Sequence, residues 1–122
     1  MIMADTRWED IFEKLQEHGI DVYSPGRKTG ECTSPYVVVK DAGRVNSTEV
    51  SSSQDLYDLM CYVPKDNYST LEPFVDRVET VMDELFPMLR PMHFRTASFY
   101  DDSVKAHMIS TQYVNWKKNR RR

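Results

Sequence analysis

Residues 69–86 read STLEPFVDRVETVMDELF, and this stretch decides the fold class. Ser69 and Glu72 have the spacing of a capping box, and Pro73 is tolerated within a first helical turn. The sequence therefore predicts a helix over 69–86 that is the main core element. Its apolar side chains recur every three or four residues, the spacing of one helix face: Leu71, Phe74, Val75, Val78, Val81, Met82, Leu85 and Phe86.

A first helix is expected near the N-terminus. Thr6 and Glu9 again have the spacing of a capping box, and Gly19 is a plausible left-handed stop after the helix. Between them, Trp8, Ile11, Phe12 and Leu15 fall at helical spacing.

Five strands are expected from β-branched or alternating runs, at residues 20–23, 35–40, 54–63, 93–100 and 105–116. With the two helices they give the order α-β-β-β-α-β-β. Consecutive strands joined as hairpins predict an α+β fold, a mainly antiparallel sheet with helices on one face. Residues 1–116 form this single domain, and residues 117–122 are a basic C-terminal tail.

The run 54–63 is largely apolar on both faces. Tyr57, Leu59, Cys61 and Val63 share one face, while Leu56, Asp58, Met60 and Tyr62 share the other. A helix would cover one face and a neighbouring subunit the other. The preceding residues 43–53 are polar and serine-rich, which suits a long hairpin connection or a flexible arm.

Charge is distributed unevenly along the 122 residues. The whole chain carries −3, whereas residues 1–116 carry −8, because five of the last six residues are basic: Lys117, Lys118, Arg120, Arg121 and Arg122. Such a tail attracts DNA phosphates or an acidic protein surface. We find no export signal and no apolar run near the ~18 residues of a membrane span, so no membrane partner is expected.

The sequence contains no recognisable catalytic or metal-binding pattern. His18, His93 and His107 are scattered, and Cys32 and Cys61, expected to be reduced thiols, show neither zinc-site spacing nor a protease signature. Residues 25–30, PGRKTG, lack the order of a phosphate-binding loop. We therefore expect no enzyme, no cofactor and no metal.

Three segments together resemble a known family: IDVYSPGRKTGECTSPYVVVKD, LYDLMCYVPKDNYSTLEPFVDRVETVMDEL and DDSVKAHMISTQYVNW. They are similar to small tail-terminator (tail-completion) proteins of phages and prophages of Gram-positive bacteria. The resemblance covers residues 9–116. It implies an antiparallel sheet packed by helices and a structural virion protein without catalytic residues.

The resemblance also implies partners and a location. The family forms a hexameric ring that caps the tail tube, stops its polymerisation and joins the tail to the neck of the capsid. We would then expect this protein in the virion, at the head-proximal end of the tail, after assembly in the host cytoplasm. The tube protein would be a partner, with sheath and neck proteins and packaged DNA as further possible ones.

Interface residues follow from the apolar second face and the polar arm. The candidates for contacts between subunits or rings are Leu56, Met60, Tyr62, Arg44, Asn46 and Glu49. Two alternatives stay open from the residues alone: another head–tail connector, such as a head-closure or neck protein, and a small nucleic-acid-binding or regulatory domain that uses the basic tail.

Overall fold

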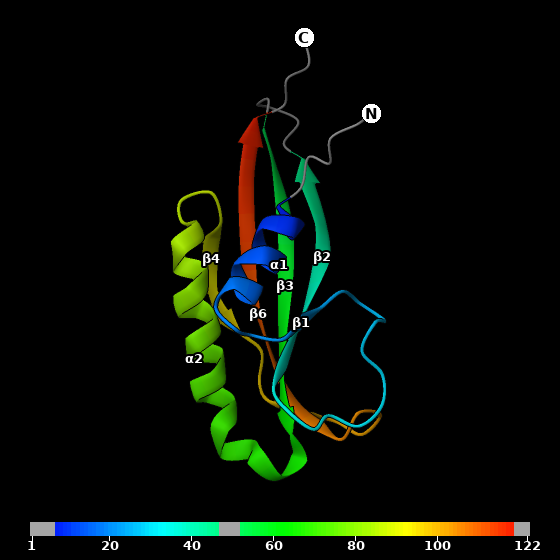
Figure 1. The fold of residues 1–122 in the computed structure, drawn as a ribbon. Coiled ribbons are helices and arrows are strands. Elements are labelled where there is room, and N and C mark those ends of the chain that lie inside the picture. Colours follow the sequence, from blue (N-terminus) through cyan, green and yellow to red (C-terminus); the bar gives the residue numbers. More distant parts are fainter. Residues whose placement is uncertain (1–6, 47–51, 119–122) are drawn as a thin grey trace.

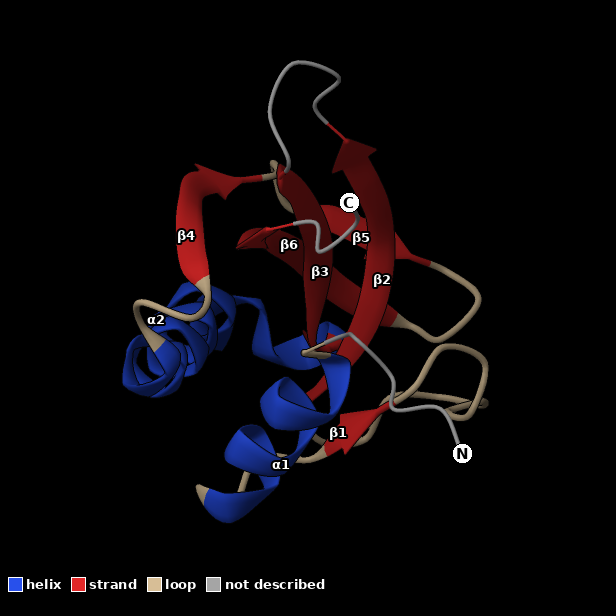
Figure 2. Cartoon of the chain, turned by 90° about the horizontal axis from the view of Figure 1, so that it is seen from above, coloured by secondary structure: helices blue, strands red, loops and turns tan. Residues whose placement is uncertain are grey.

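The computed structural model describes residues 7–46 and 52–118. Within them, six strands form one sheet in the order β1-β2-β3-β6-β4, with β5 also paired to β6 (Figures 1 and 2). The elements are α1 (Trp8–Glu17), β1 (Val22–Tyr23), β2 (Tyr36–Asn46), β3 (Ser52–Pro64), the 3₁₀ helix η1 (Lys65–Thr70), α2 (Leu71–Met82), the 3₁₀ helix η2 (Asp83–Leu85), β4 (Arg90–Arg95), β5 (Phe99–Asp101) and β6 (Ala106–Lys118).

The α+β class is confirmed, and the sheet is mixed but mostly antiparallel. β3 and β6 form its centre and pair from Ser52↔Lys118 to Pro64↔Ala106. Only β1 runs parallel to its neighbour, β2. The expected hairpin strand before β6 is divided into β4 and β5, which pair successively with the same side of β6.

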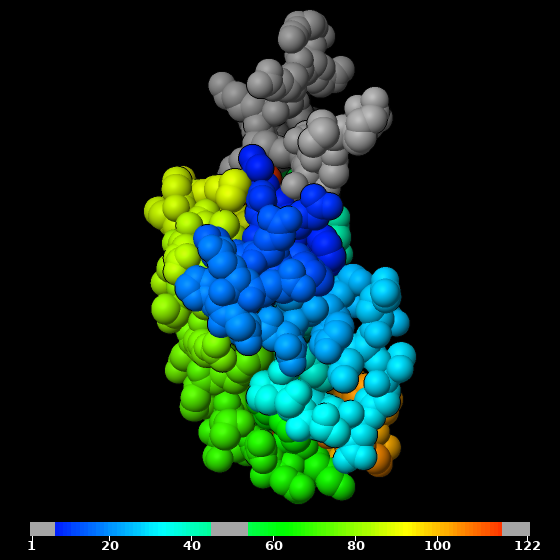
Figure 3. Space-filling view, in the orientation of Figure 1, coloured from blue at the N-terminus to red at the C-terminus, as the bar shows by residue number. Residues whose placement is uncertain are grey.

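Both helices cover one face of the sheet, and in Figure 3 they lie in front of it together with the light-blue to cyan chain that follows α1. The expected alternation in β3 is confirmed, because Tyr57, Leu59, Cys61 and Val63 are all buried beneath the helices. Ile11 and Leu15 of α1 and the apolar stripe of α2 complete this core. Two residues of the stripe expected to face the core depart from this: Phe74 is only partly buried at its margin, and Phe86 is exposed.

The start of α1 is held by tertiary contacts. The residue in the cap position is Arg7, whose side chain makes no capping hydrogen bond, and Thr6, the expected cap, lies outside the described residues. Instead, the Arg7 backbone N–H donates to the Tyr57 hydroxyl (2.8 Å). Trp8 Nε1 donates to the Val39 carbonyl (2.8 Å), which ties the first turn to β2. Gly19 ends the segment at φ 77°, as expected.

The second helix is shorter than its apolar stripe. α2 begins at Leu71 and is flanked by 3₁₀ turns, and the expected Ser69 cap is absent. The Thr70 hydroxyl bonds to the Asn67 carbonyl (2.7 Å), a local contact that competes with helical pairing. At the other end, Phe86 is extended (ψ 140°), as expected of a residue before proline.

Most of the expected arm at 43–53 belongs to the sheet. Gly43 to Asn46 continue β2, and Ser52 and Ser53 begin β3. A bulge between Asp41 and Gly43 precedes this extension, with Gly43 at φ 109° and its N–H bonded to Asp41 Oδ1 (2.9 Å). Pairing with β6 holds these polar residues extended, which overrides their weak strand preference.

Candidate functional site

The second sheet face carries Leu56, Met60 and Tyr62, as expected, and all three are partly buried. At one end this face is covered by the protein's own chain. Tyr62 stacks on Tyr36 (4.8 Å between ring centroids) and packs, with Met60, against a small cluster that includes Cys32. The Cys32 backbone N–H donates to the Val104 carbonyl (2.7 Å), which fastens the 24–35 loop over this face.

Of the other candidate interface residues, two lie on β2 and the third lies outside the described residues. Arg44 on β2 forms an ion pair with Asp55 on β3, so its side chain is engaged within the chain. Asn46 is the last residue of β2 and pairs with Ser53. Glu49 lies outside the described residues.

The basic tail is described only at its beginning. Lys117 and Lys118 are the last residues of β6 and pair with Ser53 and Ser52. Arg120, Arg121 and Arg122 lie outside the described residues.

A more exposed apolar surface lies at one edge of the sheet, which we call the β4–β5 edge (residues 90–101). Both strands pair with β6 on one side, and in the described part of the chain no strand pairs with their other side. Met92, Phe94, Phe99 and Tyr100 on this edge are exposed, Phe94 to 62%. Exposed apolar side chains on an unpaired edge are typical of a contact surface.

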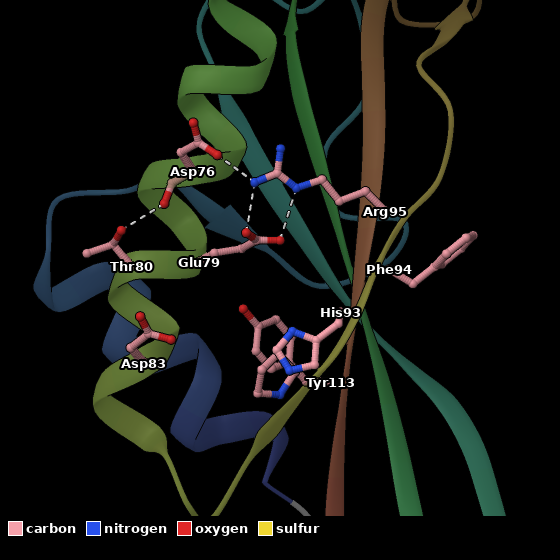
Figure 4. A pocket seen from close by; sticks show the side chains of 9 residues that line it. Asp76, Glu79, Thr80, Asp83, His93, Phe94, Arg95 and Tyr113 are labelled. Carbon is pink, nitrogen blue, oxygen red and sulfur yellow. Dashed lines mark hydrogen bonds and ion pairs between the residues drawn. The ribbon is translucent and has the colours of Figure 1, made fainter.

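An irregularity in β4 explains this exposure. Pro91 pairs with Tyr113 and Arg95 with Thr111, so three residues of β4 stand opposite Gln112 alone. His93 within this bulge has a left-handed backbone (φ 58°). Consequently Arg95 points towards α2 while Phe94 points away from it (Figure 4).

The opposite side of the sheet is also open. β1 pairs only with Val37 and Val38, so residues 40–46 of β2 have no outer strand among the described residues. The sheet therefore has two different open edges on opposite sides, the end of β2 and the β4–β5 edge (Figure 2).

Between α2 and β4 lies a groove of about 620 Å³ (Figure 4). Arg95 reaches across its end and bonds to Glu79 through two nitrogens, Nη2 (2.8 Å) and Nε (3.2 Å). Arg95 also contacts Asp76 and Glu72 on α2. The neighbouring carboxylates raise the pKa of Arg95 above its ordinary value, and the hydrogen bonds to Glu79 contribute most to this rise. The residues that line the groove are Asp76, Glu79, Thr80, Asp83, Pro91, His93, Phe94, Arg95 and Tyr113.

Two groups in this groove have no hydrogen-bond partner within the described part of the chain. The Tyr113 side chain projects from β6 towards α2 between Glu79 and Asp83 (Figure 4), and it is 1% exposed. In residues 7–46 and 52–118 its hydroxyl has no hydrogen-bond partner, nor does the Asp83 carboxylate. Burial, together with the negative charges of Glu79 and Asp83, raises the pKa of Tyr113, so the hydroxyl stays protonated at neutral pH.

The three histidines make separate contacts in the fold. His18 contacts Glu84 (3.1 Å), His107 packs between Tyr68 and Tyr100, and His93 lies in the groove. Both cysteines are free and buried, and burial raises the pKa of Cys61. Among the described residues, no three His, Cys, Asp or Glu side chains converge to hold a metal ion. The 25–30 loop leads into non-helical chain.

Sequence reasoning missed both the edge and the groove. The apolar residues of the expected strand 93–100 were visible in the sequence, and their lack of alternation was a signal for an exposed edge. The groove had no such signal, because Glu79, Arg95 and Tyr113 come from three separate elements.

None of the helices in the described chain has the length and apolar character to cross a bilayer. Comparison with protein-family models and with curated proteins finds no match to this chain.

Proposed function

We propose that this protein is a phage tail terminator: a structural protein whose copies form a ring on the head-proximal end of the tail tube. The ring stops tube polymerisation and joins the tail to the neck. The resemblance over residues 9–116 is the reason for proposing a tail terminator. The number of six copies in the ring is also inferred from this resemblance.

The observation that carries the proposal is the pair of open sheet edges. A ring of identical copies uses head-to-tail contacts, so each subunit needs two different surfaces that fit each other. The end of β2 and the β4–β5 edge lie on opposite sides of the sheet and both lack a strand neighbour in the described chain. Contact between them would cover Met92, Phe94 and Phe99 in each copy.

The chemistry of the described residues favours assembly over catalysis. The charged side chains of the groove include Arg95, Glu79 and Asp76, which form ion pairs with one another. The cysteine thiols are buried and bonded only to backbone carbonyls, Cys32 to Ser34 and Cys61 to Leu59. A nucleophile needs an exposed thiolate or a neighbouring base.

A matched pair of phenylalanine variants tests the role of the edge. Phe94→Asp places a charge in the proposed contact, whereas Phe86→Asp alters a comparably exposed phenylalanine (58%) outside residues 90–101. Each variant should fold normally, because each side chain is more than half exposed. Supplied to a phage that lacks the gene, Phe86→Asp should restore uniform tails and Phe94→Asp should not.

Restoration of uniform tails by Phe94→Asp as fully as by Phe86→Asp would contradict the assignment of this edge. Circular dichroism and thermal melting of both purified variants provide the folding control.

A further inference from the structure

The groove between α2 and β4 has the charge and the unused polar groups of a binding site for a cation. Glu72, Asp76, Glu79 and Asp83 bring four carboxylates to one side of α2, and Arg95 supplies the only guanidinium that contacts them in the described chain. The carboxylates thus exceed their positive partner, and a field of this sign concentrates cations.

The Tyr113 hydroxyl provides an independent indication of a ligand. A buried hydroxyl normally finds a hydrogen-bond partner, since leaving it without one is unfavourable. This hydroxyl lines the groove and has none among the described residues. An N–H donor that entered between Asp83 and Tyr113 would satisfy both groups at once (Figure 4).

The ligand that fits is an arginine side chain. A guanidinium presents several N–H donors in one plane and can therefore serve a carboxylate and a hydroxyl together. The groove volume of about 620 Å³ lies within the range of pockets that hold small ligands, so a guanidinium fits. Pro91 adds an apolar wall for the methylene stem.

The chain itself contains the matching segment. Residues 119–122 read NRRR and include three arginines directly after β6. Their charge is opposite to that of the groove.

These residues fall short of the groove of their own copy. A strand rises about 3.3 Å per residue, so Lys118 lies about 16 Å along β6 from Tyr113. The four residues 119–122 span at most about 14 Å when fully extended. A β-turn that starts at Lys118 brings residue 121 back only to the level of Lys118, so Arg122 returns by about 3 Å and its extended side chain adds about 7 Å. Its guanidinium therefore stays short of Tyr113 in the same copy, whereas a neighbouring copy meets no such limit.

We propose that the groove between α2 and β4 binds residues 119–122 of a second copy of the chain, with an arginine guanidinium donating to the Asp83 carboxylate and the Tyr113 hydroxyl. This inference rests on the proposed assembly of copies and adds a specific contact to it. It also gives the basic tail a protein partner in place of DNA.

A peptide-binding experiment tests the contact. The probe is a fluorescent peptide of residues 115–122, NWKKNRRR, and its binding is followed by fluorescence anisotropy. The receptor is the full chain carrying Arg120→Ser, Arg121→Ser and Arg122→Ser, so that its own tails do not compete. A peptide with serine at every basic position measures binding that is independent of charge.

Two groove variants and one control decide the outcome. Asp83→Asn and Tyr113→Phe should each weaken binding about fivefold, the effect of losing one hydrogen bond. Glu84→Gln removes the same charge one residue away, but Glu84 contacts Lys14 and His18 outside the groove, so it should change binding less than about twofold. Tyr113→Phe should not lower the melting temperature, because its hydroxyl has no hydrogen-bond partner among the described residues.

Several results would overturn the proposal. These are no binding of NWKKNRRR, equal losses for Glu84→Gln and Asp83→Asn, or a lower melting temperature that accounts for the Tyr113→Phe effect. Binding of hexalysine as tightly as NWKKNRRR would assign the groove to basic segments in general. This assay needs no phage particle, so its failure is distinguishable from a failure of the tail-terminator proposal, which is judged on tail length.

Discussion

Replacing Val78 by aspartate probes the core on which both proposed surfaces are built. Val78 is 0% exposed at the middle of α2 and belongs to the cluster that α2 forms with β3 and β6. Loss of the buried valine side chain removes about 1.5–3 kcal/mol of stabilisation. A buried, unpaired carboxylate costs several kcal/mol more. The total, about 5 kcal/mol or more, approaches the whole stability of a typical domain, 5–15 kcal/mol.

The Val78→Asp variant should therefore be largely unfolded at pH 7. Its loss of stability should shrink in acid, and the sign follows from linkage. Burial would raise the pKa of the new carboxyl above its unfolded value, so its neutral form is favoured by folding. The difference in unfolding free energy between the variant and wild type is therefore smallest below the unfolded pKa of aspartate, near 4. It grows as the pH rises above that value.

Two companion variants keep this prediction falsifiable. Thr80→Asp adds the same charge to an exposed side chain two residues away and should cost less than about 1 kcal/mol. Val78→Ala should stay folded and lose about 2 kcal/mol. Urea unfolding followed by circular dichroism measures all three. A cooperatively folded Val78→Asp protein at pH 7, with a midpoint near that of Thr80→Asp, would refute the core assignment.

Two further predictions concern the buried thiols and the charge network. Cys32 and Cys61 should resist alkylation at pH 8 until the protein unfolds. Both thiols are buried, and burial raises their pKa, so little thiolate is present to react. Rapid labelling of Cys61 in the native state would contradict its place under α2. Arg95→Met should lower the free energy of unfolding by about 1–2 kcal/mol in low salt and by less in 1 M salt. The reason is that Arg95 joins β4 to α2 through its ion pairs with Glu79 and Asp76, which salt screens. An effect that does not depend on salt would mean that packing rather than charge is lost.

The fold class could be predicted from the sequence because its core segments have strong periodicity. The stripe from Leu71 to Leu85 and the alternation from Tyr57 to Val63 fix which side chains face inward. The hairpin around Asp101 was also predictable, since its carboxylate accepts the Ser103 N–H (3.0 Å) in an aspartate turn.

Element ends and surfaces could not be predicted because tertiary contacts decide them. The serines at 52 and 53 have weak strand preference, yet pairing with β6 makes them part of β3. The first turn of α1 is bonded to the Tyr57 hydroxyl, fifty residues away, a contact that no local pattern predicts. The bulge at His93, which turns Phe94 outward and Arg95 inward, depends on the pairing of β4 with β6.

The most direct test of the central claim is the tail-length distribution of particles that lack this protein. On the proposal that this protein terminates a phage tail, its gene is deleted from the phage or prophage genome and negatively stained particles are imaged. Without a terminator the tube end keeps its binding surface for further subunits, so tails should vary widely in length and should not join heads. Uniform tails joined to full heads in the deletion mutant would contradict the account.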